Sequence, residues 1–201
     1  MTKTLIVCGP TCSGKTTLAK KLEEEYGYSR IVTYTTREPR DGEVTSVDYN
    51  FITENMFLTL AMEGFFAEFT NVGGHYYGSA KESYISKNSP DGKSVIVLDP
   101  QGVVQVIDEF KYHMDLDANS TKPFVVWLDI PQDVIMSRAI NRGDDIIDLT
   151  KRIQQDIKDF VPMRLGNFFD VRITHDYPLD KLAKYIDEVF THNKFIDQII
   201  V

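Results

Sequence analysis

A glycine-rich segment near the start of the chain has residue types suited to holding phosphate. It runs from Gly9 to Thr16, reads GPTCSGKT and fits the pattern G-x-x-x-x-G-K-[ST]. An apolar run, Leu5 to Cys8, precedes it, and a helical pattern follows. In that context the two glycines let successive backbone N–H groups turn toward phosphate oxygens, and the helix adds its positive end. We expect Lys15 to bridge the β- and γ-phosphates of a nucleoside triphosphate, and the hydroxyl of Thr16 to hold Mg²⁺.

A single carboxylate follows a later apolar run. Asp99 comes directly after Val95 to Leu98, where a P-loop protein places the carboxylate that holds Mg²⁺ directly or through water. The alternative is structural, because Asp99 can cap the helix expected from Pro100. One side chain can do both, so both roles stay open.

Side chains between residues 34 and 84 suit a phosphorylated nucleoside as a second ligand. Arg37 and Arg40 lie three apart in a loop and can form forked bonds to a terminal phosphate. The hydroxyl groups of Tyr49 and Tyr77 can donate hydrogen bonds to the same oxygens. Glu68, an acceptor only when ionised, favours a base edge with two donors, which guanine offers at N1 and N2 and adenine does not. Taken singly, these residues have ordinary alternatives: a paired surface arginine, an edge-strand tyrosine or a solvated glutamate.

The order of apolar runs and helical patterns predicts an α/β fold with a mainly parallel sheet. Near-continuous β-branched runs suit strands that are covered on both faces. The expected strands are Leu5–Cys8, Arg30–Thr33, Val95–Leu98, Phe124–Leu128 and Val171–Thr174. Apolar residues that recur at three and four predict helices over Leu18–Tyr26, Met56–Ala61, Val103–Phe110, Leu149–Phe160 and Leu179–Phe190.

Composition places the chain among globular proteins of one domain. It has 201 residues, 42% of them hydrophobic, and no glycine- or proline-rich stretch divides it. A formal charge of −8, from 30 acidic and 22 basic residues, argues against binding nucleic acid or an anionic membrane by long-range attraction. No apolar run reaches the roughly 18 residues of a membrane helix, and the apolar start ends too soon for a signal peptide, so we expect a cytoplasmic protein. Two cysteines, Cys8 and Cys12, indicate neither a disulfide framework nor a zinc site.

Several motifs, in this order, resemble those of the guanylate kinase family. After the phosphate loop come Thr33 to Glu43 (TYTTREPRDGE), Asp48 to Phe51 (DYNF), Phe66 to Glu68 (FAE), Tyr76 to Ser79 (YYGS) and Asp99 to Gly102 (DPQG). The resemblance runs from about residue 4 to residue 190. It implies a P-loop NTPase fold, a three-layer αβα sandwich with an inserted GMP-binding lobe and a short helical lid. It also implies a transferase of purine nucleotide metabolism that moves the γ-phosphoryl group of ATP to GMP or dGMP with Mg²⁺ and without a covalent intermediate.

The resemblance also assigns roles to individual residues. It implies that Lys15, Arg37, Arg138 and Arg142 are catalytic, and that Thr16 and Asp99 are metal ligands. ATP is expected to contact Gly9, Pro10, Thr11, Cys12, Ser13, Gly14, Lys15, Thr16, Thr17, Arg138 and Arg142. GMP is expected to contact Thr33, Arg37, Arg40, Tyr49, Glu68, Tyr77, Gly78, Ser79, Asp99 and Arg152.

The same resemblance divides the single domain into three parts. These are a core of residues 1–33, 80–141 and 150–201, a nucleotide lobe of residues 34–79 and a lid of residues 142–149. Arg138 and Arg142 lie four apart and so share a helix face, and Arg152 opens the next helix. In the family such arginines close over the triphosphate. Their alternative is favourable placement in the last turn of a helix.

Three positions depart from the family pattern. Val97 stands where many members have a first aspartate, Tyr34 where a small residue is commoner, and His175 where an asparagine is expected near the adenine. These departures leave open a kinase of the same fold that uses another nucleoside monophosphate. A non-catalytic binding module is a further alternative, which the intact phosphate loop disfavours.

Two segments have no assigned chemistry. The polar stretch Lys111–Pro123 predicts a surface loop. The apolar end, Lys194–Val201, suits packing either on the core or on a second subunit, so a monomer and a homodimer both stay open.

Overall fold

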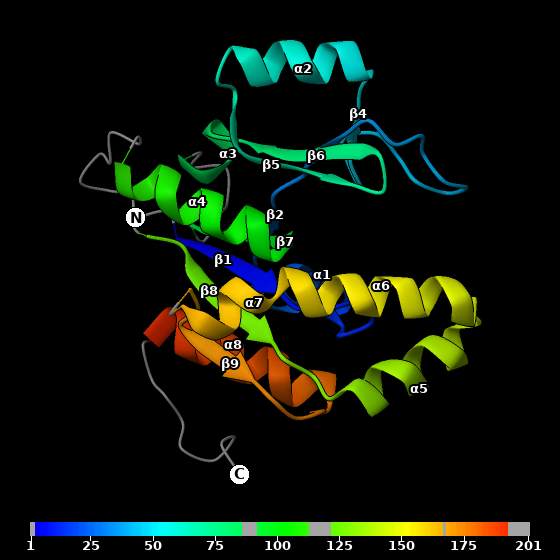
Figure 1. Ribbon diagram of the computed structural model, residues 1–201. Coiled ribbons are helices and arrows are strands. Elements are labelled where there is room, and N and C mark those ends of the chain that lie inside the picture. The colour runs from blue at the N-terminus through cyan, green and yellow to red at the C-terminus, as the bar shows by residue number, and fades with distance from the viewer. Residues whose placement is uncertain (1–2, 86–91, 113–121, 167, 193–201) are drawn as a thin grey trace.

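A sheet of five parallel strands forms the centre of the protein (Figure 1). The computed structural model describes residues 3–85, 92–112, 122–166 and 168–192. The strands of the central sheet are β1 (Lys3–Cys8), β2 (Ser29–Arg30), β7 (Lys93–Leu98), β8 (Phe124–Leu128) and β9 (Val171–Ile173). They pair in the order β2-β7-β1-β8-β9, all in parallel register. β1, which leads into the phosphate loop, therefore lies in the middle.

Helices cover both faces of this sheet. They are α1 (Lys15–Tyr26), α4 (Pro100–Tyr112), α5 (Gln132–Arg142), α6 (Ile146–Asp159), α7 (Val161–Leu165) and α8 (Leu179–His192). Successive strand residues point to opposite sides of a sheet. Leu5 and Val7 of β1 accordingly share one buried cluster with α1 and α8, while Ile6 and Cys8 share another with α4 and α7. The predicted three-layer αβα fold is confirmed.

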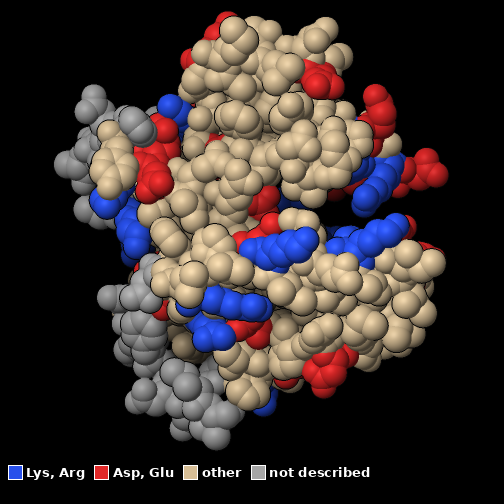
Figure 2. Space-filling model, viewed as in Figure 1, with Lys and Arg blue, Asp and Glu red and all other residues tan. Residues whose placement is uncertain are grey.

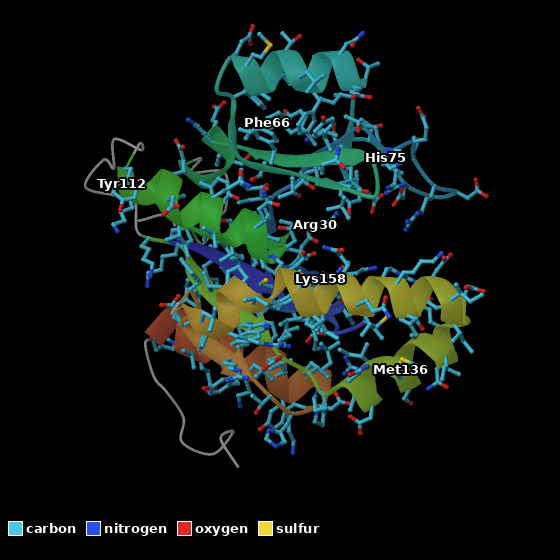
Figure 3. All side chains as sticks on the ribbon, in the orientation of Figure 1. Arg30, Phe66, His75, Tyr112, Met136 and Lys158 are labelled. Atoms are coloured by element: carbon cyan, nitrogen blue, oxygen red, sulfur yellow. The ribbon has the colours of Figure 1, made fainter. Side chains whose placement is uncertain are left out.

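A second sheet of four strands lies above the first in Figure 1 and forms a separate lobe. Its elements are β3 (Tyr34–Thr35), β4 (Asn50–Phe51), β5 (Phe66–Val72) and β6 (His75–Ala80), with α2 (Glu54–Met62) and the short α3 (Glu82–Ile85). The strands pair in the order β4-β3-β6-β5. Phe57 of α2 is fully buried and stacks on Phe66, with ring centroids 4.4 Å apart. Figure 3 shows Phe66 between α2 and this sheet, so the lobe has an aromatic core of its own.

The predicted strand Arg30–Thr33 is wrong in its extent, because β2 stops after its second residue. The N–H of Ile31 still donates to the carbonyl of Val95 in the central sheet, at 2.9 Å. The carbonyl of Thr33 instead accepts from the N–H of Asn50 in the lobe, at 2.8 Å. The β-branched run therefore marks the passage from one sheet to the other, where its hydrogen-bond partners change.

Only residues 143–145 separate α5 from α6. Gly143 has a φ of 82°, the left-handed conformation that commonly ends a helix. Asp145 caps the next helix, since its side chain accepts from the N–H groups of Ile147 and Asp148 at 2.9 and 3.0 Å. The helix predicted from Leu149 therefore begins at Ile146, inside the span expected for the lid.

The remaining elements follow the sequence prediction where the structure describes them. The expected helices beginning near residues 18, 56, 103 and 179 and the last strand are confirmed as α1, α2, α4, α8 and β9. Of the stretch Lys111–Pro123, the first two residues belong to α4, and residues 113–121 lie outside the described residues. The apolar end, Lys194–Val201, also lies outside them. None of the described helices has the length and apolar character needed to cross a membrane.

Candidate active site

The phosphate loop and Asp99 lie side by side because their strands are neighbours. Cys8 of β1 pairs with Leu98 of β7 in parallel register, so the next residues, Gly9 and Asp99, leave the sheet at the same edge. Ligands of open α/β sheets bind at this carboxyl edge. Two signals that are 90 positions apart in the sequence therefore form one site.

The backbone of the phosphate loop requires its glycines. Gly14 has a φ of 98° and Cys12 a φ of 59°, both left-handed, so the loop turns sharply before α1. A Cβ atom on Gly9 would lie 2.7 Å from Oγ of Ser13 and 2.8 Å from the carbonyl oxygen of Leu128. The loop is thus packed closely on the ends of β1 and β8, which holds its N–H groups in place.

A cavity of about 410 Å³ opens beside this loop and is called the donor cavity below. Among its lining residues are eight that were expected to contact ATP: Cys12, Ser13, Gly14, Lys15, Thr16, Thr17, Arg138 and Arg142. Tyr177, Leu179 and Leu182 complete the wall. No ligand role was expected for these three, and the spacing of Leu179 and Leu182 is typical of packing positions on an amphipathic helix.

Two arginines of α5 contact the loop directly. One Nη atom of Arg138 donates to the carbonyl oxygens of Cys12 and Ser13, at 3.2 and 2.9 Å. Its other Nη atom pairs with Asp176, at 2.5 Å. An Nη atom of Arg142 lies 3.3 Å from the sulfur of Cys12. Both arginines therefore lie on the side of α5 that faces the loop, as their spacing of four positions predicts.

A second cavity, also of about 410 Å³, lies between the lobe and the core and is called the acceptor cavity below. Six residues expected to contact GMP line it: Thr33, Tyr49, Glu68, Tyr77, Asp99 and Arg152. Gly9, Thr11 and Lys15 of the phosphate loop line it as well. In the space-filling view, lysine and arginine side chains gather along the hollow between the lobe and α6 (Figure 2).

Lys15 is the point at which the two cavities meet, since it lines both. Its Nζ atom donates to the carbonyl oxygen of Pro10, at 2.7 Å. Burial lowers the pKa of Lys15, because desolvation disfavours its charged form. A partly desolvated cation that faces two cavities is well placed to bind an anionic group lying between them.

Glu68 is a buried carboxylate in the acceptor cavity, with a side chain held at a fixed position. The residue is 3% exposed, and Oε1 accepts from the hydroxyl of Ser79 at 2.7 Å. That hydroxyl also lies 2.8 Å from the Tyr84 hydroxyl. A Cβ on Gly102 would come within 3.0 Å of Oε2, so the glycine at the start of α4 makes room for the carboxylate.

The pKa of Glu68 is raised to about 8 by this burial. The hydrogen bond from Ser79 opposes the rise, and the negative charge of Asp99 adds to it. A carboxylate kept in such a position gains most from a ligand that brings two N–H donors to it.

Asp99 caps α4, as one of its two sequence alternatives requires, and it also lines the acceptor cavity. Its Oδ1 accepts from the N–H of Gly102 at 2.8 Å, which caps α4. Its Oδ2 accepts from the hydroxyl of Thr70 at 2.8 Å, and the residue lines the acceptor cavity. The cap orients the carboxylate toward the cavity.

A model of the guanylate kinase family matches residues 1–193 of this chain. The chain belongs to the guanylate kinase family. A guanylate kinase from Nitratidesulfovibrio vulgaris is 32% identical over 98% of this chain and 93% of its own length. One from Legionella pneumophila is 32% identical over 94% of this chain and 85% of its own length. The crystal structure of guanylate kinase from Anaplasma phagocytophilum matches with a TM-score of 0.69 at 20% identity, over 98% of this chain and 89% of that one. That structural likeness supports the fold.

Two arginines of the guanylate kinase motif lie outside the lining of the acceptor cavity. An Nη atom of Arg37 pairs with Oε1 of Glu43 at 2.9 Å, and its guanidinium lies 5.4 Å from the centre of the Tyr49 ring. The N–H of Arg40 donates to Oε2 of Glu43 at 2.7 Å, while the residue itself is exposed. Glu43 therefore fixes both ends of this loop. Glu43 belongs to the motif that the sequence shows, but its contact with Arg37, six positions away in a loop, cannot be predicted from spacing.

Two further residues expected to contact GMP lie behind the lining of the cavity. Ser79 is fully buried and acts through its bond to Glu68. A Cβ on Gly78 would lie 3.0 Å from the Glu68 carbonyl oxygen, so the close approach of β5 and β6 needs glycine there. Four polar residues of the acceptor cavity were not predicted from the sequence: Thr70, Gln155, Asp156 and Asp159. Gln155, Asp156 and Asp159 lie on α6, a helix that the sequence indicates through its apolar residues alone.

Proposed function

We propose that this protein transfers the γ-phosphoryl group of ATP to GMP, giving ADP and GDP. The observation that carries the proposal is the position of Lys15, which lines a donor cavity formed by the phosphate loop and an acceptor cavity that holds a buried glutamate. Membership of the guanylate kinase family supports the same reaction.

Glu68 would select the base. An ionised Glu68 accepts two hydrogen bonds, which matches the N1 and N2 donors of guanine, whereas adenine presents an acceptor at N1. Two donors favour the charged form of a carboxyl group whose pKa burial raises to about 8. Guanine binding and deprotonation of Glu68 are therefore coupled.

The remaining groups would position phosphates and balance charge. The acceptor phosphate has a second pKa near 6 and is already ionised at neutral pH, so the reaction needs no strong general base. Lys15 and the two arginines of α5 would neutralise charge on the group being transferred. Tyr49, Tyr77 and Arg152 would hold the acceptor phosphate, and Arg37 would join them by exchanging Glu43 for phosphate.

The donor set fits Mg²⁺. Thr16 offers a hydroxyl in the donor cavity and Asp99 a carboxylate in the acceptor cavity, both hard oxygen ligands. No group of three or more His, Cys, Asp or Glu side chains suited to a metal occurs in the part of the chain that the structure describes. The other ligands would therefore be water and phosphate oxygens, as Mg²⁺ prefers. When bound, the ion neutralises charge on the β- and γ-phosphates.

Closure of the lobe over the core would exclude water, which otherwise competes as acceptor and hydrolyses ATP. Residues 31–33 lead from the central sheet to the sheet of the lobe, and the acceptor cavity lies between the lobe and the core. We expect the α5–α6 hairpin, which carries Arg138, Arg142 and Arg152, to approach the lobe in the same movement.

An assay of ADP release with a panel of nucleoside monophosphates tests the proposal. We expect ADP release to depend on GMP or dGMP and to be far slower with AMP, CMP or UMP. Absence of any GMP-dependent release would contradict it. Faster release with another nucleotide would favour a kinase of the same fold with a different acceptor, the alternative raised by Val97, Tyr34 and His175.

A further inference from the structure

A carboxylate from α6 accepts a hydrogen bond from a backbone N–H group of the phosphate loop. Oδ2 of Asp156 accepts from the N–H of Thr11 at 2.8 Å, across 145 positions of sequence. Asp156 is half-buried and lines the acceptor cavity together with Thr11 and Lys15. An anionic side chain thus already sits where the loop is built to receive an anion.

The N–H group that donates to Asp156 lies at the junction of the two cavities. Residues 12 to 17 line the donor cavity, whereas Thr11 lines the acceptor cavity, and Lys15 lines both. A phosphoryl group that passes from donor to acceptor must lie at this junction, while the phosphates that stay with the donor lie deeper along the loop. In the proposed reaction, Thr11 therefore faces the position of the γ-phosphate.

A second, indirect connection joins the same helix to the loop through two ion pairs. Arg152, one turn before Asp156, pairs with Asp144 at 3.0 Å. Asp144 also pairs with Arg142, whose guanidinium lies 3.3 Å from the sulfur of Cys12. Loop residues 11 and 12 therefore contact side chains of α6 and α5, the two helices that follow one another at the right of Figure 1.

We propose that Asp156 is a specificity residue of the donor site that distinguishes ATP from ADP. Its carboxylate holds the γ-phosphate position in the unliganded protein, so ADP binds beside it and ATP must displace it. Two anionic oxygens cannot share one N–H donor at close range without strong repulsion. ATP binding then frees α6 from the loop, and departure of the γ-phosphoryl group lets Asp156 return. The proposal rests on the proposed function, because it takes the donor to be ATP.

Calorimetric titration without GMP tests this assignment. Mg²⁺-ADP and the Mg²⁺ complex of the β,γ-imido analogue of ATP are titrated into the parent protein, Asp156→Asn and Asp156→Ala. We expect the analogue to bind about tenfold more tightly to both variants, the effect of one modest charge-assisted hydrogen bond, and ADP to change by less than about twofold. Asp156→Asn keeps the shape and an acceptor, so it isolates the charge if the alanine variant fails to fold.

Asp159→Asn is the matched control. Asp159 lies on the same helix and lines the same cavity, but its carboxylate accepts from the side chain of Gln155, at 2.7 Å, and not from the loop. We expect this variant to keep the parent ratio of the two affinities. An equal shift in the control, an equal gain for both nucleotides in the Asp156 variants, or no gain for the ATP analogue would overturn the assignment. Failure of the parent protein to bind either nucleotide would remove the proposed function, and this inference with it.

Discussion

The donor cavity and the acceptor cavity meet at Lys15 but differ in the charges that line them. On the donor side, backbone N–H groups and the guanidinium groups of Arg138 and Arg142 surround the loop. On the acceptor side, Lys15 and Arg152 face several carboxylates, of which Glu68 is buried.

The contrast follows from what each side has to recognise. Phosphates are common to all nucleotides, so fixed dipoles and cations are sufficient to bind them. A base is recognised by its pattern of donors, which requires an acceptor held in a dry position. On the acceptor side, burial therefore raises the pKa of the selecting carboxyl group, so the two sides are expected to respond differently to mutation and to pH.

Removal of Lys15 is expected to have the largest effect, because it belongs to both cavities. We expect Lys15→Ala to lower kcat about a thousandfold, as loss of a fixed cation at the transferred group does. Steady-state ADP release, compared with thermal unfolding to check the fold, measures this. A loss of less than tenfold in a folded variant would break the assignment of Lys15 to the junction.

Replacement of Glu68 is expected to affect the acceptor side alone. We expect Glu68→Gln to lower kcat/KM for GMP about a hundredfold, because the amide places a donor against a guanine donor. The affinity for ATP should be unchanged. Equal use of GMP and AMP by the parent protein would remove the basis for placing the base at Glu68.

The same residue makes folding stability depend on pH. Glu68 has a pKa of about 8 when folded, against 4.5 as an ordinary value, so the folded state holds its proton more tightly than the unfolded state. Its contribution is therefore fully present below about pH 4.5 and is lost as pH rises toward 8. Between pH 6 and pH 8 we expect the free energy of unfolding of the parent protein to fall by about 2 kcal/mol relative to Glu68→Gln.

Denaturant unfolding of both proteins at several pH values measures that difference. Parallel pH profiles would show that Glu68 is ionised throughout, and would remove the coupling between guanine binding and its deprotonation.

The Arg37–Glu43 pair is expected to have the smallest effect. Arg37→Lys keeps the charge but loses the forked geometry, so we expect KM for GMP to rise about tenfold and KM for ATP to stay the same. Glu43→Gln frees the guanidinium and should not raise KM for GMP in this way. Unchanged KM for GMP in Arg37→Lys would place Arg37 in loop structure only.

The parts predicted correctly from sequence are those that local patterns determine. The run before Gly9, the loop itself and the helix after it form a continuous segment, and parallel strand order brings Asp99 to the same edge. The errors lie at the ends of elements, where hydrogen bonds outside the apolar pattern decide. Asn50 ends the strand expected over Arg30–Thr33, and Asp145 starts α6 early.

Contacts between particular side chains could not be predicted from the sequence either. Asp156 reaches Thr11 across 145 positions, and Glu43 takes the guanidinium that spacing assigned to a phosphate. The burial of Glu68, which gives it a raised pKa, depends on packing of β5 against α4 and is not encoded in any short motif.

Transfer of label from [γ-³²P]ATP in the presence of GMP tests most directly whether the two cavities serve one reaction. The account predicts that the label appears in GDP, in proportion to the ADP formed, with little free phosphate. Label found only in inorganic phosphate, with GMP unchanged, would contradict it.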